Sequence, residues 1–403
     1  MAGPGSQWIG KEEVQELLDV MSSGHLFRYG GLEDPDFKHK VYSFEQEFAA
    51  KCGCRYALAT SSGTAALVCA LKAMGIREGD EIIVPAYTFI ATYSAVVFAG
   101  GIPVLAEIDD SLSLDPADIE HRIGARTKAI MPVHMLGNPC DLDGIKVVAS
   151  KHGLRVIEDV CQANGASYRG RRLGSSGEIG AFSLNIFKTV TAGDGGVVVT
   201  DDENLYTLAF GFHDQGHSPL RADVEVGRRS VLGMNFRMNE LTGAVALAQL
   251  RKLDRIIAVL REKKRLFKES IGDIKGMRFR TLNDPEGECA TLCTVIFDSP
   301  EKANRVSQRL GTTTVTHSGW HVYSNMEHFN HYLRESGRPH GKGAYPRTDS
   351  LLSRAINLSV GVVDPGLGAA FGINIDSSSE EIRQTAARFR DACRDSGMDS
   401  DCV

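Results

Sequence analysis

The fold is decided by residues 155–200, which read RVIEDVCQANGASYRGRRLGSSGEIGAFSLNIFKTVTAGDGGVVVT. Three short apolar runs in it, Arg155–Glu158, Ile179–Ser183 and Gly196–Thr200, predict strands separated by glycine-rich loops. The first run ends in acidic residues, and Lys188 follows the second. Because open α/β sheets bind ligands at the carboxyl ends of their strands, this stretch predicts a sheet with a site at its edge.

Upstream of this stretch, strands and helices continue to alternate. Short apolar runs at Tyr56–Ala59, Glu81–Val84, Pro103–Glu107 and Thr127–His134 predict further strands. Helices are predicted at Thr92–Ala99, at Leu142–His152 and from the sequence SSGTAA at residues 61–66. This alternation is typical of the α/β class, with a mixed, mostly parallel sheet flanked by helices.

Downstream, the pattern changes after Met238. A long helix is predicted over Glu240–Arg265, followed by strands at Arg278–Thr281 and Cys289–Phe297 and a helix at Pro300–Leu310. We therefore expect an N-terminal arm and large domain over residues 1–255 and a smaller C-terminal α+β domain over residues 256–391. Residues 392–403 are polar and are expected to form a flexible tail.

Composition excludes several classes of protein. The chain has 403 residues, 42% of them hydrophobic and 24% charged, which is typical of globular proteins. A net charge of −6 without a basic stripe argues against nucleic-acid binding. No segment is apolar for long enough to predict a membrane span, and the N-terminus does not resemble a secretory signal. Nine cysteines without a paired spacing predict neither disulfides nor a metal site, so a cytoplasmic location is expected.

Ser62, Gly63 and Thr64 directly follow a predicted strand and open a helix. Small residues allow a ligand close to the backbone, and a helix N-terminus offers free N–H groups to an anion. By itself, however, this pattern also describes an ordinary helix-capping turn.

Asp159 and Lys188 are the strongest candidates for chemistry. A carboxylate at a buried strand end needs a cationic partner; the alternatives are a solvated strand end or a pair of metal ligands. A lysine enclosed by apolar residues loses preference for its ammonium form and becomes a nucleophile for carbonyl groups. The alternative for Lys188 is a surface lysine that keeps its amine in water.

Asn235 and Arg237 are polar residues in the otherwise apolar segment before the long helix. Their alternative role is structural, because Asn239 lies where a helix cap is expected. The chain has no dinucleotide-binding GxGxxG turn after a strand, which argues against a nicotinamide-dependent dehydrogenase.

The order of these segments indicates a pyridoxal phosphate (PLP) site. PLP requires an anion cradle, a carboxylate facing its pyridine nitrogen and a Schiff-base lysine. In this order the chain resembles the DegT/DnrJ/EryC1/StrS aminotransferases, a fold-type-I PLP family, from about Gly24 to Arg390. The resemblance rests on the following motifs: SSGTAAL, GDEIIVPAYTFIAT, KAIMPVHMLG, VIEDVCQANGASYRGRRLGSSGEIGAFSLNIFK, GDGG and GMNFRMNELTGAVALAQLRKLD. The C-terminal run TDSLLSRAINLSV is similar to that of amino-octulosonate aminotransferases and aminohydroxybenzoate synthases.

The resemblance implies roles for individual residues. Lys188 binds PLP covalently and acts as acid and base, and Asp159 pairs with the ring nitrogen. Ser62, Gly63, Thr64 and Ser183 bind the phosphate. Gln162 hydrogen-bonds the ring oxygen, and Phe89 stacks on the ring. Asn235 reaches the phosphate in the neighbouring subunit, which implies a homodimer with shared active sites.

Substrate recognition is less defined. The family places a substrate-facing loop at Phe212–Arg229, so His213 and His217 are candidates together with Arg237, Trp320 and His321. For most of the histidines, a plain surface role is the alternative. The small departures from the family pattern are Asp194 in the glycine-rich turn, where glutamate is common, and Leu184, where phenylalanine is usual.

The resemblance implies transfer of an amino group from a glutamate- or glutamine-type donor to a keto sugar or related carbocycle, in secondary-metabolite or surface-sugar biosynthesis. Lys188 argues against the dehydratases of the family, which replace this lysine by histidine. Two alternatives remain. The same scaffold supports elimination, replacement or carbon–carbon bond formation on an amino acid such as S-adenosylmethionine, and some relatives are proposed to be non-catalytic regulators.

Overall fold

The computed structural model describes residues 3–31, 33–219 and 231–398. Its largest sheet has seven strands in the order β1-β9-β8-β5-β4-β2-β3. β9 is antiparallel to both of its neighbours, and every other adjacent pair is parallel. The predicted mixed, mostly parallel sheet is therefore confirmed. The strands are β1 (Tyr56–Thr60), β2 (Glu81–Pro85), β3 (Ile102–Ala106), β4 (Thr127–Ile130), β5 (Arg155–Asp159), β8 (Ile179–Ser183) and β9 (Gly196–Thr200).

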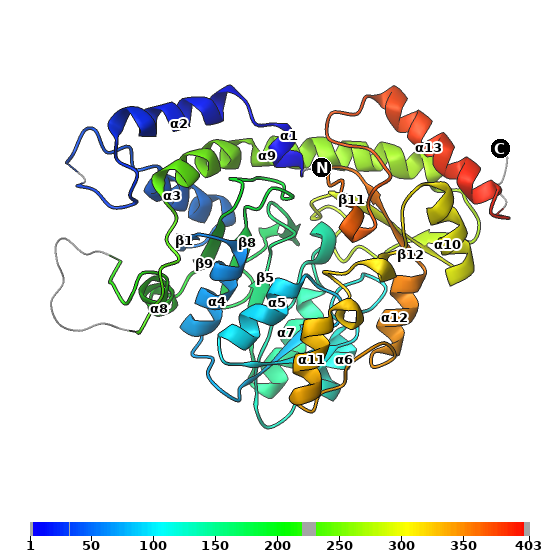
Figure 1. Ribbon diagram of the computed structural model, residues 1–403, viewed down its shortest axis with the longest axis horizontal. Coiled ribbons are helices and arrows are strands. Elements are labelled where there is room, and N and C mark those ends of the chain that lie inside the picture. The colour runs from blue at the N-terminus through cyan, green and yellow to red at the C-terminus, as the bar shows by residue number, and fades with distance from the viewer. Residues whose placement is uncertain (1–2, 32, 220–230, 399–403) are drawn as a thin grey trace.

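Helices cover both faces of this sheet (Figure 1). Strand residues alternate between the two sides: Leu58 packs with α4, α5 and α8, whereas Ala57 and Ala59 pack with α3 and α9. A further apolar cluster joins α6 and α7 to β2, β3 and β4. The helices are α3 (Lys40–Cys52), α4 (Gly63–Ala73), α5 (Ile90–Phe98), α6 (Pro116–Arg122), α7 (Leu142–His152), α8 (Glu203–His213) and α9 (Glu240–Ile271).

The C-terminal part is built on a three-stranded antiparallel sheet, β10-β11-β12. The long helix α9 runs across the upper part of the molecule, beneath α2 and α13, and packs against the N-terminal helices and, farther along, α13 (Figure 1). α9 ends at Ile271 rather than Arg265, because Phe267 and Ile271 continue its buried face. The elements are β10 (Met277–Phe279), β11 (Leu292–Phe297), β12 (Ala355–Ser359), α10 (Pro300–Arg309), α11 (Glu327–Glu335), α12 (Pro346–Ser353) and α13 (Ser379–Arg394).

Other predictions about segment ends are also wrong. β4 ends at Ile130 rather than His134, since Pro132 has no N–H to donate to a sheet. The expected flexible tail is in part a packed helix: α13 continues to Arg394, and Cys393 and Met398 are buried in the main apolar cluster. Cys393 continues the apolar face of the helix. The polar overall composition of residues 392–403 does not reveal this face. Residues 399–403 lie outside the described chain.

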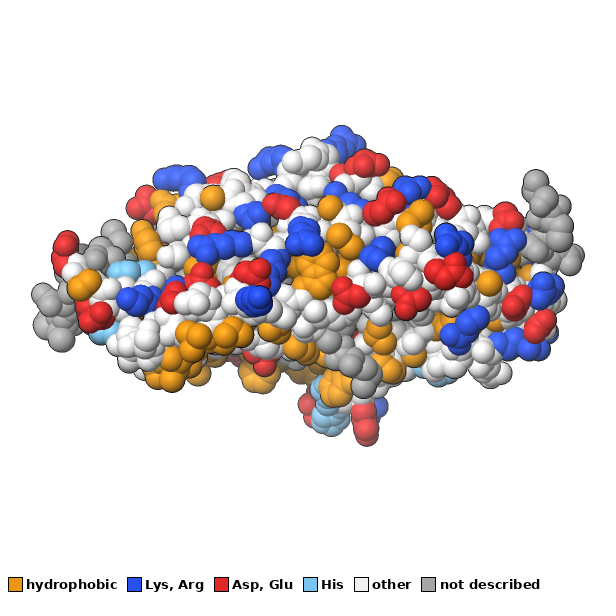
Figure 2. Space-filling view, turned by 90° about the horizontal axis from the view of Figure 1, so that it is seen from above, with side chains coloured by type: hydrophobic (Ala, Val, Ile, Leu, Met, Phe, Trp, Pro, Cys, Tyr) orange, Lys and Arg blue, Asp and Glu red, His pale blue; other side chains and the backbone are white. Residues whose placement is uncertain are grey.

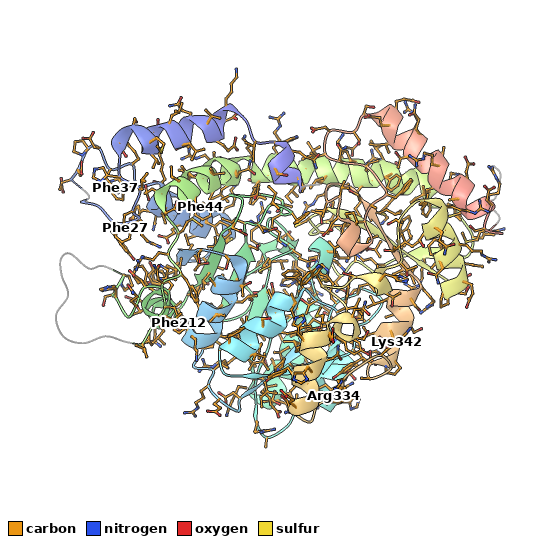
Figure 3. All side chains as sticks on the ribbon, in the orientation of Figure 1. Phe27, Phe37, Phe44, Phe212, Arg334 and Lys342 are labelled. Atoms are coloured by element: carbon orange, nitrogen blue, oxygen red, sulfur yellow. The ribbon has the colours of Figure 1, made fainter. Side chains whose placement is uncertain are left out.

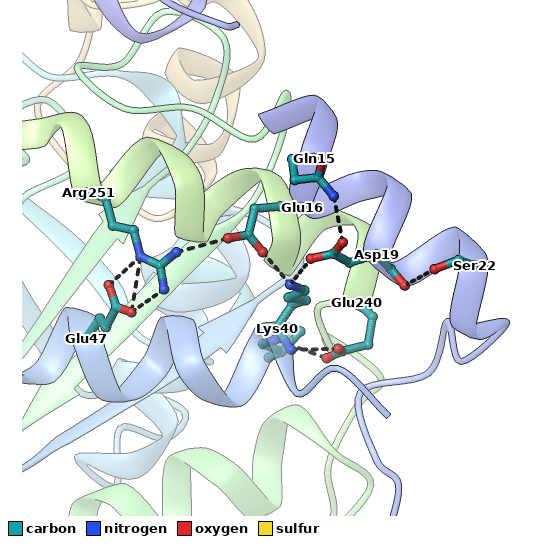
Figure 4. Close-up of polar contacts among 9 residues, drawn as sticks. Gln15, Glu16, Asp19, Ser22, Lys40, Glu47, Glu240 and Arg251 are labelled. Carbon is teal, nitrogen blue, oxygen red and sulfur yellow. Dashed lines mark hydrogen bonds and ion pairs between the residues drawn. The ribbon is translucent and has the colours of Figure 1, made fainter. Parts of the chain in front are cut away.

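The N-terminal arm comprises α1 (Pro4–Gln7) and α2 (Lys11–Ser23). α2 lies along α9 and is held by charged contacts (Figure 4). Arg251 of α9 bonds Glu16 of α2 at 2.9 Å and Glu47 of α3, while Lys40 of α3 bonds Asp19 of α2 at 3.0 Å. These contacts join the arm to the two helices that cover one face of the main sheet.

Short elements complete the described chain. No helix within it is both long and apolar enough to cross a membrane. The short elements are the hairpin β6 (Ser167–Tyr168) and β7 (Arg171–Arg172), and the 3₁₀ turns η1 (Met135–Gly137), η2 (Val315–His317), η3 (Tyr323–Asn325) and η4 (Pro365–Leu367).

Candidate active site

A cavity of about 550 Å³ lies where the carboxyl ends of β5 and β8 meet the N-terminus of α4. Residues of the C-terminal part close its other side, including Trp320, His321 and Asp364. The cavity therefore lies at the edge of the sheet where the strand pattern predicts a ligand site.

The start of α4 forms one wall of this cavity. Ser62 caps the helix, its hydroxyl accepting the Ala65 N–H at 3.1 Å. The N–H groups of Gly63 and Thr64, at the start of the helix, have no acceptor inside it and are available to an anion. A Cβ on Gly63 would lie 2.7 Å from Cβ of Ser183, so glycine is needed for this close approach. The turn, including Thr64, lines the cavity together with Ser183, which fits a bound phosphate group.

Asp159 enters the cavity from the end of β5. Its side chain is 2% exposed and accepts hydrogen bonds from the Thr92 hydroxyl at 2.8 Å and the Cys161 N–H at 3.0 Å. These two donors fix the carboxylate in the wall of the cavity. A buried carboxylate aimed at a cavity is suited to a cationic partner, such as a protonated ring nitrogen.

Glu158, the preceding acid, has a structural role. It is fully buried and accepts the N–H groups of Ser176 and Gly177, each at 2.6 Å. His134 bonds it at 3.2 Å. Since the Cys140 N–H donates to Nδ1 of His134, the ring proton lies on Nε2 and points to Glu158. Successive side chains alternate along a strand, so only one of the two acids faces the cavity.

Lys188 lies on the loop between β8 and β9 and lines the cavity. Burial lowers the pKa of its ammonium group, although the nearby Cys161 and Asp159 side chains oppose the shift. A lowered pKa leaves more of the neutral amine, which is the form that attacks a carbonyl. This environment is the one predicted from the apolar residues around Lys188.

The lysine loop is held from behind by the N-terminal arm. The Gly3 N–H donates to the Ile186 carbonyl at 3.0 Å, and the Gly5 N–H donates to the Lys188 carbonyl at 3.3 Å. A Cβ on Gly5 would lie 2.8 Å from Cα of Val190, so this approach also requires glycine. The arm therefore supports the backbone from which the Lys188 side chain extends.

Gln162 and Phe89 also line the cavity. Oε1 of Gln162 accepts the Leu136 N–H at 3.0 Å, which turns its amide NH₂ group away from that contact and leaves it as a donor. The Phe89 ring is 40% exposed, with its centroid 5.3 Å from that of His321. An exposed aromatic face in a cavity is suited to stacking on a flat ligand.

The substrate candidates separate into two groups. Trp320 and His321 line the cavity. His213 does not: it is fully buried at the end of α8, within 3.1 Å of the Arg28 guanidinium. Burial and the Arg28 charge lower the pKa of His213 to about 3, so its ring is a neutral part of the core. The sequence places His213 in the segment expected to face the substrate, but it does not show that α8 turns the side chain into the core.

The remaining candidates do not line the cavity in this single chain. Arg237 forms an ion pair with the buried Asp214, and Asn235 is exposed to solvent. His217 does not line the cavity either. Residues 220–230, most of the expected substrate-facing loop, lie outside the described chain.

The residues of the site that were missed from sequence include Thr92 and Asp364. Thr92 orients Asp159, and its motif FIAT was part of the family resemblance without a role for the threonine. Asp364, which caps the start of η4, lines the cavity although it lies far along the chain from the other site residues. The only local signal was the turn-forming sequence DPG at residues 364–366, which predicts a turn but not its position.

Solved structures with this architecture are PLP-dependent aminotransferases of fold type I, and the chain is of that class. The family is equally clear. The chain belongs to the DegT/DnrJ/EryC1/StrS aminotransferase family, whose model matches residues 7–363. PLP is the cofactor of this family.

Individual relatives are similar over different lengths. The chain is 40% identical to the GDP-perosamine synthase of Escherichia coli O157:H7 over 66% of this chain and 69% of that enzyme. It is 43% identical to the GDP-perosamine synthase of Caulobacter vibrioides over 54% of this chain and 58% of that enzyme. The structure of a 3-amino-5-hydroxybenzoic acid synthase is 28% identical, with a TM-score of 0.80, and the match covers 98% of this chain and all of that one.

Proposed function

We propose that this protein transfers an amino group from an amino acid of the glutamate or glutamine type to the keto group of a sugar or a related hydroxylated carbocycle. The observation that carries the proposal is the convergence of Lys188, Asp159 and the N-terminus of α4 on one cavity. The similarity to GDP-perosamine synthases and an aminohydroxybenzoate synthase supports amino transfer to a ring in secondary-metabolite or surface-sugar biosynthesis.

The side chains of the cavity suit PLP. The first turn of α4, from Ser62 to Thr64, and the Ser183 hydroxyl offer donors to the phosphate. Asp159 offers a carboxylate to the ring nitrogen. When bound, PLP supplies an electron sink for the carbon that carries the amino group.

Lys188, Phe89 and Gln162 complete this assignment. The neutral amine of Lys188 attaches the cofactor and, once released, moves a proton to and from the reacting carbon. Phe89 packs on the ring face, and the NH₂ group of Gln162 donates to the ring oxygen.

The test is transfer of isotope-labelled nitrogen from L-glutamate to a keto ring. The protein is incubated with PLP, L-[¹⁵N]glutamate and a panel of keto sugars and keto cyclitols, and the products are analysed by mass spectrometry. A labelled amino sugar or aminocyclitol is expected with the wild type and not with Lys188→Ala. Release of ammonia or of a coupled product from another amino acid, with no labelled ring, would instead establish elimination or carbon–carbon bond formation.

A non-catalytic regulator is the remaining alternative. A regulator has no need of a lysine whose pKa is lowered by burial beside a fixed carboxylate. Replacing the wild-type gene with one that encodes the Lys188→Ala variant distinguishes an enzyme from a regulator. Loss of the biological role supports an enzyme, and its full retention supports a regulator.

We further propose a homodimer with shared active sites. Asn235 is exposed and lies off the cavity of its own chain, as a residue that serves a neighbouring site must. Exposed apolar side chains along α2 and the segment after it supply a surface to bury. They are Val14, Leu18, Met21, Leu26 and Phe27. Figure 3 places Phe27 at the same end of the molecule as Phe212 of α8.

Two organisational features belong to the same proposal. The boundary between a large domain (1–255) and a small domain (256–391) falls inside α9, whose apolar face contributes to one core shared by both parts. Free thiols at the eight cysteines of the described chain are consistent with a cytoplasmic enzyme.

Charged side chains of both signs are mixed over the face seen in Figure 2, with apolar ones gathered along one edge.

A further inference from the structure

The turn η1, which follows β4, fixes the side chain of Gln162. Oε1 of Gln162 accepts the Leu136 N–H at 3.0 Å, which is the one hydrogen bond of this side chain within the described chain. Because only the oxygen of an amide accepts a hydrogen bond, this contact sets which end of the group faces the turn. The NH₂ end is left for the cavity, which Gln162 lines. The position of the Leu136 N–H therefore determines whether Gln162 acts as a donor there.

Leu136 itself has an unfavourable backbone conformation. Its φ of 56° and ψ of 33° are left-handed, a region that the bulky side chain of leucine disfavours. Gly137, which follows, is also left-handed, with φ of 78°. A non-glycine residue stays in this region only where its surroundings hold it. The turn η1 therefore needs contacts that fix Leu136.

Arg280 supplies such contacts from the C-terminal part. Its Nη1 donates to the Met135 carbonyl at 3.0 Å, and its Nη2 donates to the Leu136 carbonyl at 2.9 Å. Pro139, three residues after Leu136, has no N–H with which to bond that carbonyl along the turn. The two arms of the guanidinium group thus bind two successive carbonyls of η1.

The burial of Arg280 is costly, because a buried charge normally pairs with an acid. Arg280 is 3% exposed, forms no ion pair among the described residues and leaves its Nε buried without a partner. Burial lowers the pKa of its guanidinium group, which the Glu288 carboxylate opposes, but an arginine keeps its charge. Glu288 is itself paired with Lys264. A charge retained at this cost points to the positioning of η1.

We propose that Arg280 is a positioning residue for Gln162: it holds η1 in the conformation that turns the amide NH₂ toward the ring oxygen of the cofactor. The inference rests on the proposed function, which gives Gln162 that donor role. It adds a residue that does not line the cavity and acts on the cofactor through another side chain. Without the two bonds from Arg280, Leu136 can leave the left-handed region and its N–H moves away. The Gln162 amide is then free to rotate and to present its oxygen, an acceptor, to the ring oxygen.

The ionisation of lysine-bound PLP reports on this donor. The absorbance of the bound cofactor changes with pH as a proton leaves it. A hydrogen-bond donor at the ring oxygen stabilises the more negative form and so lowers the pH of the midpoint. Loss of a hydrogen bond to a charged oxygen should raise the midpoint by about one to two pH units. The ionisable groups beside Lys188, which are Cys161, Asp159 and Asp364, are the same in every variant.

The variants separate the donor from the residue that positions it. Gln162→Leu removes the donor, Arg280→Met removes the guanidinium group, and Arg280→Lys keeps the charge without the planar fork. A double variant combines Gln162→Leu with Arg280→Met. Arg354→Met is the control, because Arg354 also bonds a backbone carbonyl in the C-terminal part, that of Ser350 at 3.1 Å, and does not line the cavity. Melting temperatures and PLP dissociation constants verify that each protein is folded and binds the cofactor.

The expected result is a midpoint that rises in Gln162→Leu and in Arg280→Met. Arg280→Lys should show a smaller rise, since an ammonium group does not reproduce the paired donors of the fork. Arg354→Met should keep the wild-type midpoint. The double variant should titrate like Gln162→Leu alone, because Arg280 acts through the amide and has no effect once the amide is gone.

A wild-type midpoint in Arg280→Met, or in Gln162→Leu, would overturn the inference. A shift from Arg280→Met that adds in full to that of Gln162→Leu would also overturn it, since the charge would then act without the amide. If Arg280→Met does not fold, Arg280→Lys, alone and combined with Gln162→Leu, gives the same comparison. A wild-type protein that forms no lysine-bound band would instead overturn the proposed function.

Discussion

At the scale of single residues, the site depends on the environments of Lys188 and Asp159. Both positions were predicted from sequence, because the residue types, their order and their place after strands suit PLP together. The sequence could not show that Thr92 holds Asp159 or that Glu158 faces the other way. Those facts follow from strand alternation and from contacts between residues far apart in the chain.

The substitution Asp159→Asn tests the carboxylate at this scale. An amide keeps the size of the side chain but cannot neutralise a protonated ring nitrogen. Loss of a charged hydrogen bond of about 1.5–3 kcal/mol predicts a fall in turnover of roughly ten- to a hundred-fold or more. Stopped-flow absorbance of the glutamate half-reaction measures this rate. Glu158→Gln, in contrast, should lower the melting temperature and leave the rate constant close to the wild-type value. Equal rates in Asp159→Asn and wild type would contradict the role assigned to Asp159.

The lowered pKa of Lys188 predicts the pH dependence of cofactor attachment. Only the neutral amine attacks the PLP aldehyde, and a pKa below the ordinary value raises the neutral fraction at any pH beneath it. The rate of attachment to the cofactor-free protein should therefore rise with pH and level off below the usual lysine midpoint of about 10.4. Attachment is followed by absorbance over a pH series. A midpoint at or above that of an exposed lysine would show that burial does not act on Lys188 as described.

At the scale of secondary-structure elements, the contact between the N-terminal arm and the lysine loop has a direct consequence. A Cβ at Gly5 would lie 2.7 Å from Oε1 of Gln249 and 2.8 Å from Cα of Val190. Gly5→Ala should therefore displace the arm, at a cost of about 1–3 kcal/mol for overpacking, and loosen the backbone of Lys188. Gly10→Ala is the matched control, because its nearest neighbour would be 3.4 Å away, in a flexible glutamate.

Two measurements decide this point. The fraction of protein with attached PLP, read from absorbance at a limiting PLP concentration, should fall in Gly5→Ala and stay at the wild-type level in Gly10→Ala. The melting temperature of the cofactor-free proteins reports stability separately. A Gly5→Ala protein that melts earlier but attaches PLP normally would limit the arm to a structural role.

Element types were largely predictable, whereas their ends and contacts were not. The strands Ile179–Ser183 and Gly196–Thr200 were predicted at their observed bounds, since short apolar runs bounded by glycine-rich loops favour strands. α9 continues beyond its predicted end, and α13 continues into the residues expected to form a flexible tail, because buried residues such as Ile271 and Cys393 sustain them. The helical spacing of apolar residues predicts that a helix is present, but it does not locate the last turn of that helix.

At the scale of the whole molecule, the cavity joins segments that are distant in sequence. His321 and Asp364 reach it from the C-terminal part, while Asp159 and Lys188 reach it from the central sheet. No local sequence pattern indicates that these segments meet, so the sequence alone could not bring them together in one cavity. His213 illustrates the limit: its segment was suggestive, but the packing of α8 buries it beside Arg28.

Shared active sites predict complementation between two inactive variants. Lys188→Ala lacks the attachment residue, and Asn235→Ala lacks the residue expected to serve the neighbouring site. In a mixed dimer, one of the two sites would contain both intact residues. Equal amounts, unfolded and refolded together, should therefore recover about one quarter of wild-type activity, because half the dimers are mixed and each has one good site. Activity that never exceeds the sum of the separate variants would show that Asn235 does not act across a dimer.

The central claim is that Lys188 forms the covalent link to PLP in an aminotransferase. The absorbance spectrum of the PLP-incubated protein, recorded with and without L-glutamate beside Lys188→Ala, tests it most directly. The account predicts a band of lysine-bound PLP that glutamate converts to the pyridoxamine form, and no such band before glutamate in Lys188→Ala. A wild-type protein that shows no lysine-bound band with excess PLP, or a Lys188→Ala protein that keeps the band, would contradict it.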